Sequence, residues 1–123
     1  MPHVLVVEDD KELMFVLEQL LENLGHQVTG ALDGETAWAW LSNGQNRPDI
    51  ILCDLTLPAM TGLTFLNHVR SSSVTQGCRF IAMSGSPEER AASFAIGACA
   101  YLVKPFFLRD LERVLADCLP PQV

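Results

Sequence analysis

Polar and charged residues follow four short apolar runs of the sequence, each at the point where the run ends. These residues are Glu8, Asp9, Asp54, Ser84 and Lys104. In an open α/β sheet, ligands bind beyond the carboxyl ends of parallel strands, so residues that end neighbouring strands share one site. Any one of them alone could be an ordinary turn or cap residue. Their agreement at four strand ends predicts a functional cluster.

The residue types in this cluster suit phosphoryl-transfer chemistry. Three carboxylates beside a single ammonium repel one another, and a hard divalent cation with oxygen ligands relieves that repulsion. Mg²⁺ fits best, because it takes carboxylate, carbonyl and phosphoryl oxygens while keeping several waters. A carboxylate beside that ion can attack phosphorus and form an acyl phosphate, with the metal, a hydroxyl and an ammonium each contacting one equatorial oxygen. Asp54, Ser84 and Lys104 are predicted to be the nucleophile, the hydroxyl and the ammonium.

The elements that must position this cluster follow from the alternation of five apolar runs with five segments of helical periodicity. The expected strands are 4–7, 28–31, 50–53, 80–83 and 101–103, and helices are expected near 11–24, 34–42, 62–70, 87–97 and 108–119. Such alternation is typical of βαβ units around a parallel sheet, and the mostly continuous hydrophobicity of the runs favours strands covered on both faces. The sequence therefore predicts an α/β fold.

Local chemistry supports several of the helix boundaries. Asp33 can cap the second helix, and Ser86-Pro87-Glu88-Glu89 is typical of a capping box that starts the fourth helix at the proline. On the first helix, a stripe of leucines at 3.6-residue spacing is expected to face the core. The stripe consists of Leu13, Leu17, Leu20, Leu21 and Leu24.

The length of 123 residues, with 49% apolar and 19% charged residues, fits one compact domain. No apolar run approaches the roughly 18 residues of a membrane span, and the first residues carry no export signal, so we expect a cytoplasmic protein. A net charge of −7 without a local basic cluster disfavours direct binding to nucleic acid. Cys53, Cys78, Cys99 and Cys118 lack metal-ligand or redox spacing and are expected to be reduced thiols.

Four short motifs give the sequence a family resemblance that spans nearly the whole chain. They are Val6-Val7-Glu8-Asp9, Asp54-Leu55-Thr56-Leu57-Pro58 with Gly62 beyond, Met83-Ser84-Gly85 and Lys104-Pro105-Phe106. In order, spacing and placement on strand ends, the set resembles the receiver domains of two-component response regulators. The resemblance implies a flavodoxin-like (βα)5 doubly wound sheet in the order 2-1-3-4-5. It also implies a receiver domain over residues 1–119, with 120–123 as a tail or the start of a linker.

The same resemblance assigns roles to individual residues. It implies that Asp54 is the phosphoacceptor, that Lys104 contacts the phosphoryl group and that the Lys104-Pro105 bond is cis. Mg²⁺ would be held by Asp9, Asp54 and the backbone carbonyl of Thr56, with Glu8 helping through water. Ser84 and Tyr101 would form a coupled switch. The implied donor is a histidine kinase or a histidine phosphotransfer protein, and the implied recipient of the signal is a downstream protein target or output domain.

Two alternatives use the same residues. An aspartate-nucleophile phosphatase of the haloacid dehalogenase type also combines Mg²⁺, a Ser/Thr and a Lys, and Asp54-Leu55-Thr56 is similar to its opening motif. That family places the nucleophile after the first strand of its core, whereas here the acidic pair comes first, so a receiver is favoured. A degenerate receiver that only binds proteins usually lacks an acid, the phosphoacceptor or the lysine, and this chain keeps them all.

Two aromatic residues break the local pattern. Phe15 lies opposite the leucine stripe of the first helix, and Phe107 stands where receivers often carry a short polar cap. Both are expected to be partly exposed near the acidic cluster, where they could anchor a phosphohistidine-bearing partner. The alternative is that Phe107 tucks beneath the last helix and Phe15 is an isolated exposed apolar residue.

Overall fold

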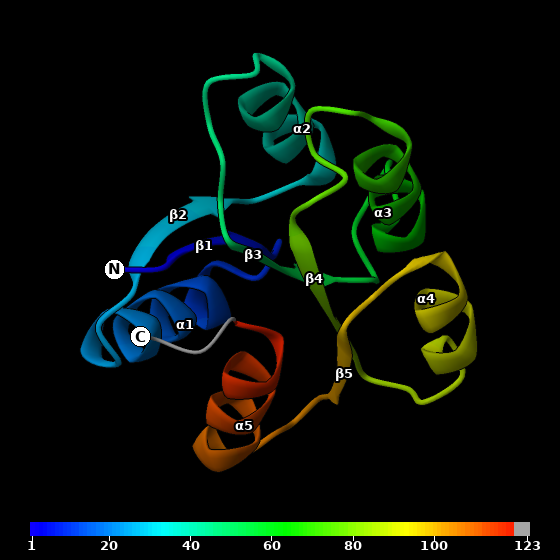
Figure 1. Cartoon of the computed structure of the whole chain (residues 1–123). Helices are drawn as coiled ribbons and strands as arrows, with labels where there is room; N and C mark the ends of the chain where they lie inside the picture. The colour runs from blue at the N-terminus through cyan, green and yellow to red at the C-terminus, as the bar shows by residue number, and fades with distance from the viewer. Residues whose placement is uncertain (120–123) are drawn as a thin grey trace.

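The computed structural model describes residues 1–119 and contains five strands alternating with five helices (Figure 1). The strands are β1 (His3–Val7), β2 (Gln27–Ala31), β3 (Ile50–Asp54), β4 (Arg79–Ser84) and β5 (Ala100–Val103). The helices are α1 (Lys11–Asn23), α2 (Gly34–Ser42), α3 (Gly62–Ser71), α4 (Arg90–Ile96) and α5 (Leu108–Cys118). Residues 120–123, expected as a tail or linker, lie outside the described residues. Within 1–119, no helix combines the length and apolar character needed to cross a bilayer.

All five strands are parallel and form one sheet in the order β2-β1-β3-β4-β5. The predicted fold class and strand order are confirmed. Because every strand points the same way, all five carboxyl ends lie along a single edge of the sheet.

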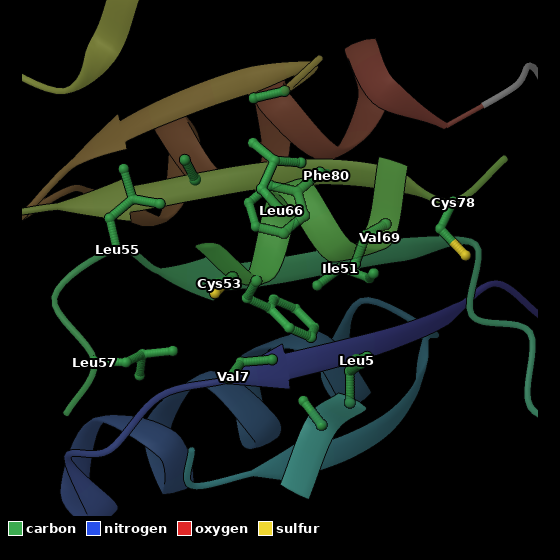
Figure 2. Packing of buried hydrophobic residues seen from close by; sticks show 14 of the residues in the cluster. Leu5, Val7, Ile51, Cys53, Leu55, Leu57, Leu66, Val69, Cys78 and Phe80 are labelled. Carbon is green, nitrogen blue, oxygen red and sulfur yellow. The ribbon is translucent and has the colours of Figure 1, made fainter. Parts of the chain in front are cut away.

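Helices cover both faces of the sheet, with α1 and α5 on one side and α2, α3 and α4 on the other (Figure 1). Neighbouring residues of a strand point to opposite faces, so β1 supplies both cores. Leu5 and Val7 pack towards α2 and α3, whereas Val4 and Val6 pack towards α1 and α5. Figure 2 shows the first of these cores, where Leu5 and Val7 lie close to side chains of β3 and α3.

The expected start of the fourth helix is wrong, and the expected inward face of the first helix is right except at one end. Helix α4 begins at Arg90 rather than at Pro87, because the Ser86 hydroxyl accepts from the Glu88 amide and closes a turn instead of capping a helix. On α1 the leucine stripe does face the core at Leu17 and Leu21, which are buried, and at Leu13 and Leu20, which pack against it in part. Leu24 is exposed instead, and Met14 is buried although it was not expected in the stripe.

The expectation of four reduced thiols is also wrong. The structure joins Cys99 to Cys118 in a disulfide, whereas Cys53 and Cys78 are free and buried. The paired residues are 19 positions apart in the sequence, but the start of β5 lies against the end of α5 and brings their Cα atoms to 6.1 Å. That separation is ordinary for a disulfide.

At the amino-terminal edge of the sheet, the side chain of Arg70, near the end of α3, binds backbone carbonyls of neighbouring segments. Its guanidinium donates to the backbone carbonyls of Gln76, Cys78 and Gly97 at 3.1, 2.6 and 2.9 Å. Desolvation by burial lowers the pKa of Arg70. One side chain thereby ties α3 to the turn before β4 and to the end of α4.

Candidate functional site

The residues predicted from strand ends do meet at the carboxyl edge of the sheet. Asp54 and Ser84 are the last residues of β3 and β4, and Glu8 and Lys104 directly follow β1 and β5. Val7 pairs with Cys53, which places Glu8 beside Asp54. The Lys104 amide donates to the Ser84 carbonyl at 2.7 Å. The strand register therefore holds all four residues side by side.

Lys104 is the central cation of this edge. Its Nζ lies 2.6 Å from Glu8 Oε1 and 3.1 Å from Asp54 Oδ2. Glu8 is 1% and Asp54 5% exposed, so both carboxylates are largely removed from water. Desolvation raises the pKa of Glu8 despite its hydrogen bond from Lys104. Burial alone would lower the pKa of Lys104, but the hydrogen bond with Glu8 and the charge of Asp54 outweigh it and raise that pKa.

Three carboxylates gather at this edge of the sheet. Glu8, Asp9 and Asp54 each place an oxygen so that the three ligand atoms lie within 4.8 Å of one another. Glu8 and Asp54 are buried, whereas Asp9 is exposed. Such a set of hard oxygen donors around partly desolvated negative charge suits Mg²⁺, which combines protein carboxylates with retained waters. The donor chemistry of the described residues fits the metal implied by the sequence.

Backbone amides fix the orientation of the acidic side chains. The Thr56 amide donates to Asp54 Oδ1 at 2.9 Å, so both oxygens of Asp54 have donors. The Asp10 amide donates to Glu8 Oε2 at 3.0 Å, and the Asp10 carboxylate in turn accepts from the amides of Glu12 and Leu13 as the N-cap of α1. Asp10 was missed by sequence reasoning. Its position directly before a helical pattern was the available signal.

Ser84 and Tyr101, the expected switch pair, both contact Ser86. The Ser86 amide donates to Ser84 Oγ at 3.2 Å, and the Tyr101 hydroxyl donates to the Ser86 carbonyl. Ser84 is 2% and Tyr101 8% exposed, so the tyrosine ring already lies inside the protein. The turn after β4 thus links a residue at the acidic edge to one on β5.

Phe15 and Phe107 are exposed, as expected, at 63% and 67%. Phe107 does not tuck beneath α5, because its ring lies under the Arg109 guanidinium at 4.9 Å. The carboxylate of Asp110 accepts from the Phe107 amide at 3.0 Å, which satisfies the N-cap residue of α5, but the phenyl ring itself cannot cap the first turn. Phe107 lines a hollow formed by β5 and α5, and Phe15 is not part of that lining.

A separate apolar groove lies between α1 and the segment that follows β5. Its lining consists of Leu13, Val16, Leu17, Leu20, Lys104, Pro105 and Phe106. Val16, which is 48% exposed, contributes to this groove, whereas Phe15 does not. The Lys104–Pro105 peptide bond at one end of the groove is cis, as the resemblance implies.

Comparison with known proteins identifies the family to which this fold and this acidic site belong. The family model of the response regulator receiver domain matches residues 4–116. The transcriptional regulatory protein PrrA of Mycobacterium bovis is 36% identical over 110 residues, which are 89% of this chain and 46% of PrrA. The solved structure of the chemotaxis response regulator CheY4 of Vibrio cholerae superimposes with a TM-score of 0.87 at 32% identity, covering 97% of this chain and 99% of CheY4.

A second solved structure is the receiver domain of the sensor histidine kinase PA1611 from Pseudomonas aeruginosa, which has a magnesium ion coordinated in its active-site cleft. It has a TM-score of 0.82 at 31% identity and covers 93% of each chain. The chain belongs to the response regulator receiver family and is a receiver domain of two-component signalling. It spans about half the length, or less, of the curated relatives it matches, with 46% of PrrA and 25% of NtrC from Azospirillum brasilense.

Proposed function

We propose that Asp54 accepts a phosphoryl group from a phosphohistidine of a histidine kinase or histidine phosphotransfer protein. The observation that supports this assignment is the pairing of Asp54: one carboxylate oxygen faces the Lys104 ammonium and the other faces the Thr56 amide. A largely buried carboxylate between two fixed donors is held in one orientation. The same donors remain available to oxygens of an incoming phosphoryl group.

The transfer is a single displacement at phosphorus. An Asp54 oxygen attacks, the P–N bond breaks, and its electron pair stays on the imidazole, which takes a proton. Lys104 moves its hydrogen bond from the carboxylates to a phosphoryl oxygen, and the Ser84 hydroxyl donates to another. Later attack by water on the acyl phosphate regenerates Asp54. The chain therefore catalyses only its own phosphorylation and dephosphorylation, as a phosphoacceptor switch.

Asp9, Asp54 and the backbone carbonyl of Thr56 would hold Mg²⁺, with Glu8 contacting one of its waters. When bound, the ion supplies positive charge that offsets the carboxylates and the transferring phosphoryl oxygens. Asp9 is the exposed member of the cluster and lies where a hydrated ion can arrive from solvent.

The switch we propose runs from Ser84 to Tyr101 through the turn after β4. When the Ser84 hydroxyl turns to the phosphoryl group, it gives up the Ser86 amide, and the Ser86 carbonyl that holds the Tyr101 hydroxyl shifts with it. The affected surface comprises α4, β5 and α5, since Tyr101 lies on the strand between those helices. A downstream protein or output domain would read that surface.

Phe15, Phe107 and the apolar groove are the proposed contacts of the phosphodonor. Lys104 belongs both to the acidic edge and to the groove lining, so a helix in the groove lies beside the phosphoacceptor. The exposed aromatic rings would flank such a helix. Membership of the receiver family also supports two broader proposals. We place the protein in the cytoplasm, and we assign residues 1–119 to the receiver domain.

Acetyl phosphate labelling with and without Mg²⁺, followed by intact mass, tests the phosphoacceptor. Wild type is expected to gain one hydroxylamine-labile phosphoryl group only with Mg²⁺, and Asp54→Asn none. Asp117→Asn, at an exposed position of α5, is the matched control and should label normally. An acid-stable phosphate on Ser84 in Asp54→Asn would contradict the assignment.

Docking is tested by comparing labelling from a cognate phosphohistidine donor with labelling by acetyl phosphate. Phe15→Ala, Phe107→Ala and Val16→Ser should slow the first reaction and leave the second unchanged. Equal effects on both reactions would reject the docking face.

A further inference from the structure

The Cys99–Cys118 pair lies apart from the acidic site and has no part in the phosphoryl chemistry. Cys99 sits in the turn between α4 and β5, and Cys118 is the last residue of α5. Their disulfide bridges the start of β5 and the end of α5. It therefore spans two of the three elements whose surface the proposed switch changes.

The two cysteine residues differ in accessibility. Cys99 is exposed, whereas Cys118 is 0% exposed and packs in the core between the sheet, α1 and α5. A reagent from solvent can reach Cys99 first, and Cys118 can then react only with its neighbour. An exposed cysteine beside a buried resolving cysteine is the arrangement of reversible thiol oxidation.

The remaining cysteines are poorly suited to this chemistry. Cys53 lies within β3, where burial and the nearby carboxylates of Asp54 and Glu8 raise its pKa well above the ordinary value. Burial also raises the pKa of Cys78. Both thiols are buried and free, so each is expected to stay reduced under conditions that oxidise the paired cysteines.

We propose that Cys99 and Cys118 form a redox-active dithiol that hydroperoxides oxidise to an intramolecular disulfide, and that this disulfide restrains α5 and damps its response to phosphorylation. In a reducing cytoplasm such a bond forms on oxidation and is later removed, instead of being a permanent structural link. The damping rests on the proposed function of Asp54, whereas disulfide formation does not.

The oxidation occurs in two balanced steps. The Cys99 thiolate attacks one peroxide oxygen, the O–O bond breaks, and the departing oxygen takes the proton that the thiol lost, leaving a sulfenic acid. The Cys118 sulfur then attacks the Cys99 sulfur, the S–O bond breaks, and water leaves with the Cys118 proton. The cysteines lose two electrons and the peroxide gains them. A dithiol reductant reverses the reaction by thiol–disulfide exchange.

Disulfide formation is tested on the full chain with hydrogen peroxide, alkylation under denaturing conditions and peptide mapping. The reduced chain should label at all four cysteines, and the oxidised chain only at Cys53 and Cys78, with reversal by dithiothreitol. The oxidised chain should also melt roughly 10 °C higher, because a cross-link over 19 positions restricts the unfolded state. Continued labelling of Cys99 and Cys118, a sulfinic acid on Cys99 or a bond between two chains would overturn the proposal.

Two variants separate loss of the bond from loss of folding. Cys99→Ser changes an exposed position and should fold like the reduced chain, with a melting point that peroxide no longer raises. Cys118→Ala removes the buried partner, and peroxide should not raise the melting point of the folded variant either. Cys78→Ala is the matched control and should retain the peroxide effect. A peroxide-dependent rise in Cys99→Ser would reject the pair.

Damping is tested with Mg²⁺ and beryllofluoride, a phosphoryl mimic, by hydrogen exchange of 108–118. The reduced chain should change exchange on addition of the mimic, and oxidation should cut that change to less than about half by tying down the end of α5. A change of equal size in both forms would overturn the damping. Absence of any change in the reduced chain would instead reject the proposed switch and the damping together, while the disulfide is judged by the thiol assay.

Discussion

The two edges of the parallel sheet differ in how far their charged side chains are matched by partners. At the amino-terminal edge, one guanidinium is matched by three backbone carbonyls, and the Asp49 carboxylate accepts from the His3 amide at 2.8 Å. At the carboxyl edge, three carboxylates cluster, and the Lys104 ammonium contacts two of them. Lys104 pairs with both Glu8 and Asp54, so one positive charge is shared between two carboxylates, and Asp9 has no ion-pair partner among the described residues.

This difference distinguishes a structural closure from a binding site. Polar groups that are hydrogen-bonded to one another stabilise the fold and gain little from binding a ligand. Partly buried carboxylates that repel one another weaken the fold until a cation arrives, so their free energy is available for binding. A change at the carboxyl edge should therefore depend on Mg²⁺, and a change at the amino-terminal edge should not.

The largest effect should come from the backbone that shapes the carboxyl edge. A Cβ at position 62 would lie 2.5 Å from the Leu55 Cα and 2.7 Å from the Asp54 carbonyl oxygen, both of them backbone atoms. Gly62→Ala should lower the free energy of unfolding by about 3 kcal/mol, measured by urea denaturation. Gly85→Ala is the control, because a Cβ there meets nothing within 4 Å. Equal losses in the two variants would contradict this explanation.

Removing the central cation should show the metal dependence directly. Lys104→Met leaves two buried carboxylates facing each other and should cost roughly 2–3 kcal/mol without metal. Mg²⁺ should restore most of that loss, measured as thermal or urea stability against Mg²⁺ concentration. Lys11→Met, at an exposed position, should change little. If Mg²⁺ did not restore the stability lost in Lys104→Met, the carboxyl edge would not be a metal-dependent site and the proposed difference between the edges would be wrong.

Arg70→Met tests the opposite edge. It leaves three carbonyls without their donor, and we expect a loss of about 2 kcal/mol because water can reach part of this edge. The loss should be the same with and without Mg²⁺. Arg79→Met, an exposed arginine at the start of β4, is the matched control. Recovery of the Arg70 variant in Mg²⁺ would show that the two edges are coupled.

The smallest effect concerns a single cap near the carboxyl edge. Asp33 Oδ1 accepts from the Thr36 amide at 2.6 Å, and this bond lowers the pKa of Asp33. Asp33→Ala should cost about 1 kcal/mol at neutral pH, whereas Asp33→Asn should keep the cap. Because the folded-state pKa lies below the unfolded value, the advantage of wild type over Asp33→Asn should shrink as pH falls through the folded pKa. Stability curves from pH 2 to 7 measure this difference, and a pH-independent advantage would contradict it.

Several features of the fold and the site could be read from the sequence. Apolar runs predicted all five strands within one residue at either end, for example 50–53 against the observed Ile50–Asp54. Glu8, Asp54, Ser84 and Lys104 were found because each directly follows such a run. These features depend on neighbours in the chain and on the rule that parallel strands end at one edge, so local pattern was sufficient.

Other features were decided only by the tertiary structure. The partner of Cys99, the Gly97 carbonyl bound by Arg70 and the Ser86 carbonyl bound by Tyr101 lie in other segments of the chain. The inward face of α1 and the start of α4 depend likewise on what packs or bonds there. By itself the sequence determined which residues lie at the functional edge, since strand direction follows from chain order. Which of them are paired, and which charges stay unbalanced, depends on side chains meeting across the fold, and only the tertiary structure decided that.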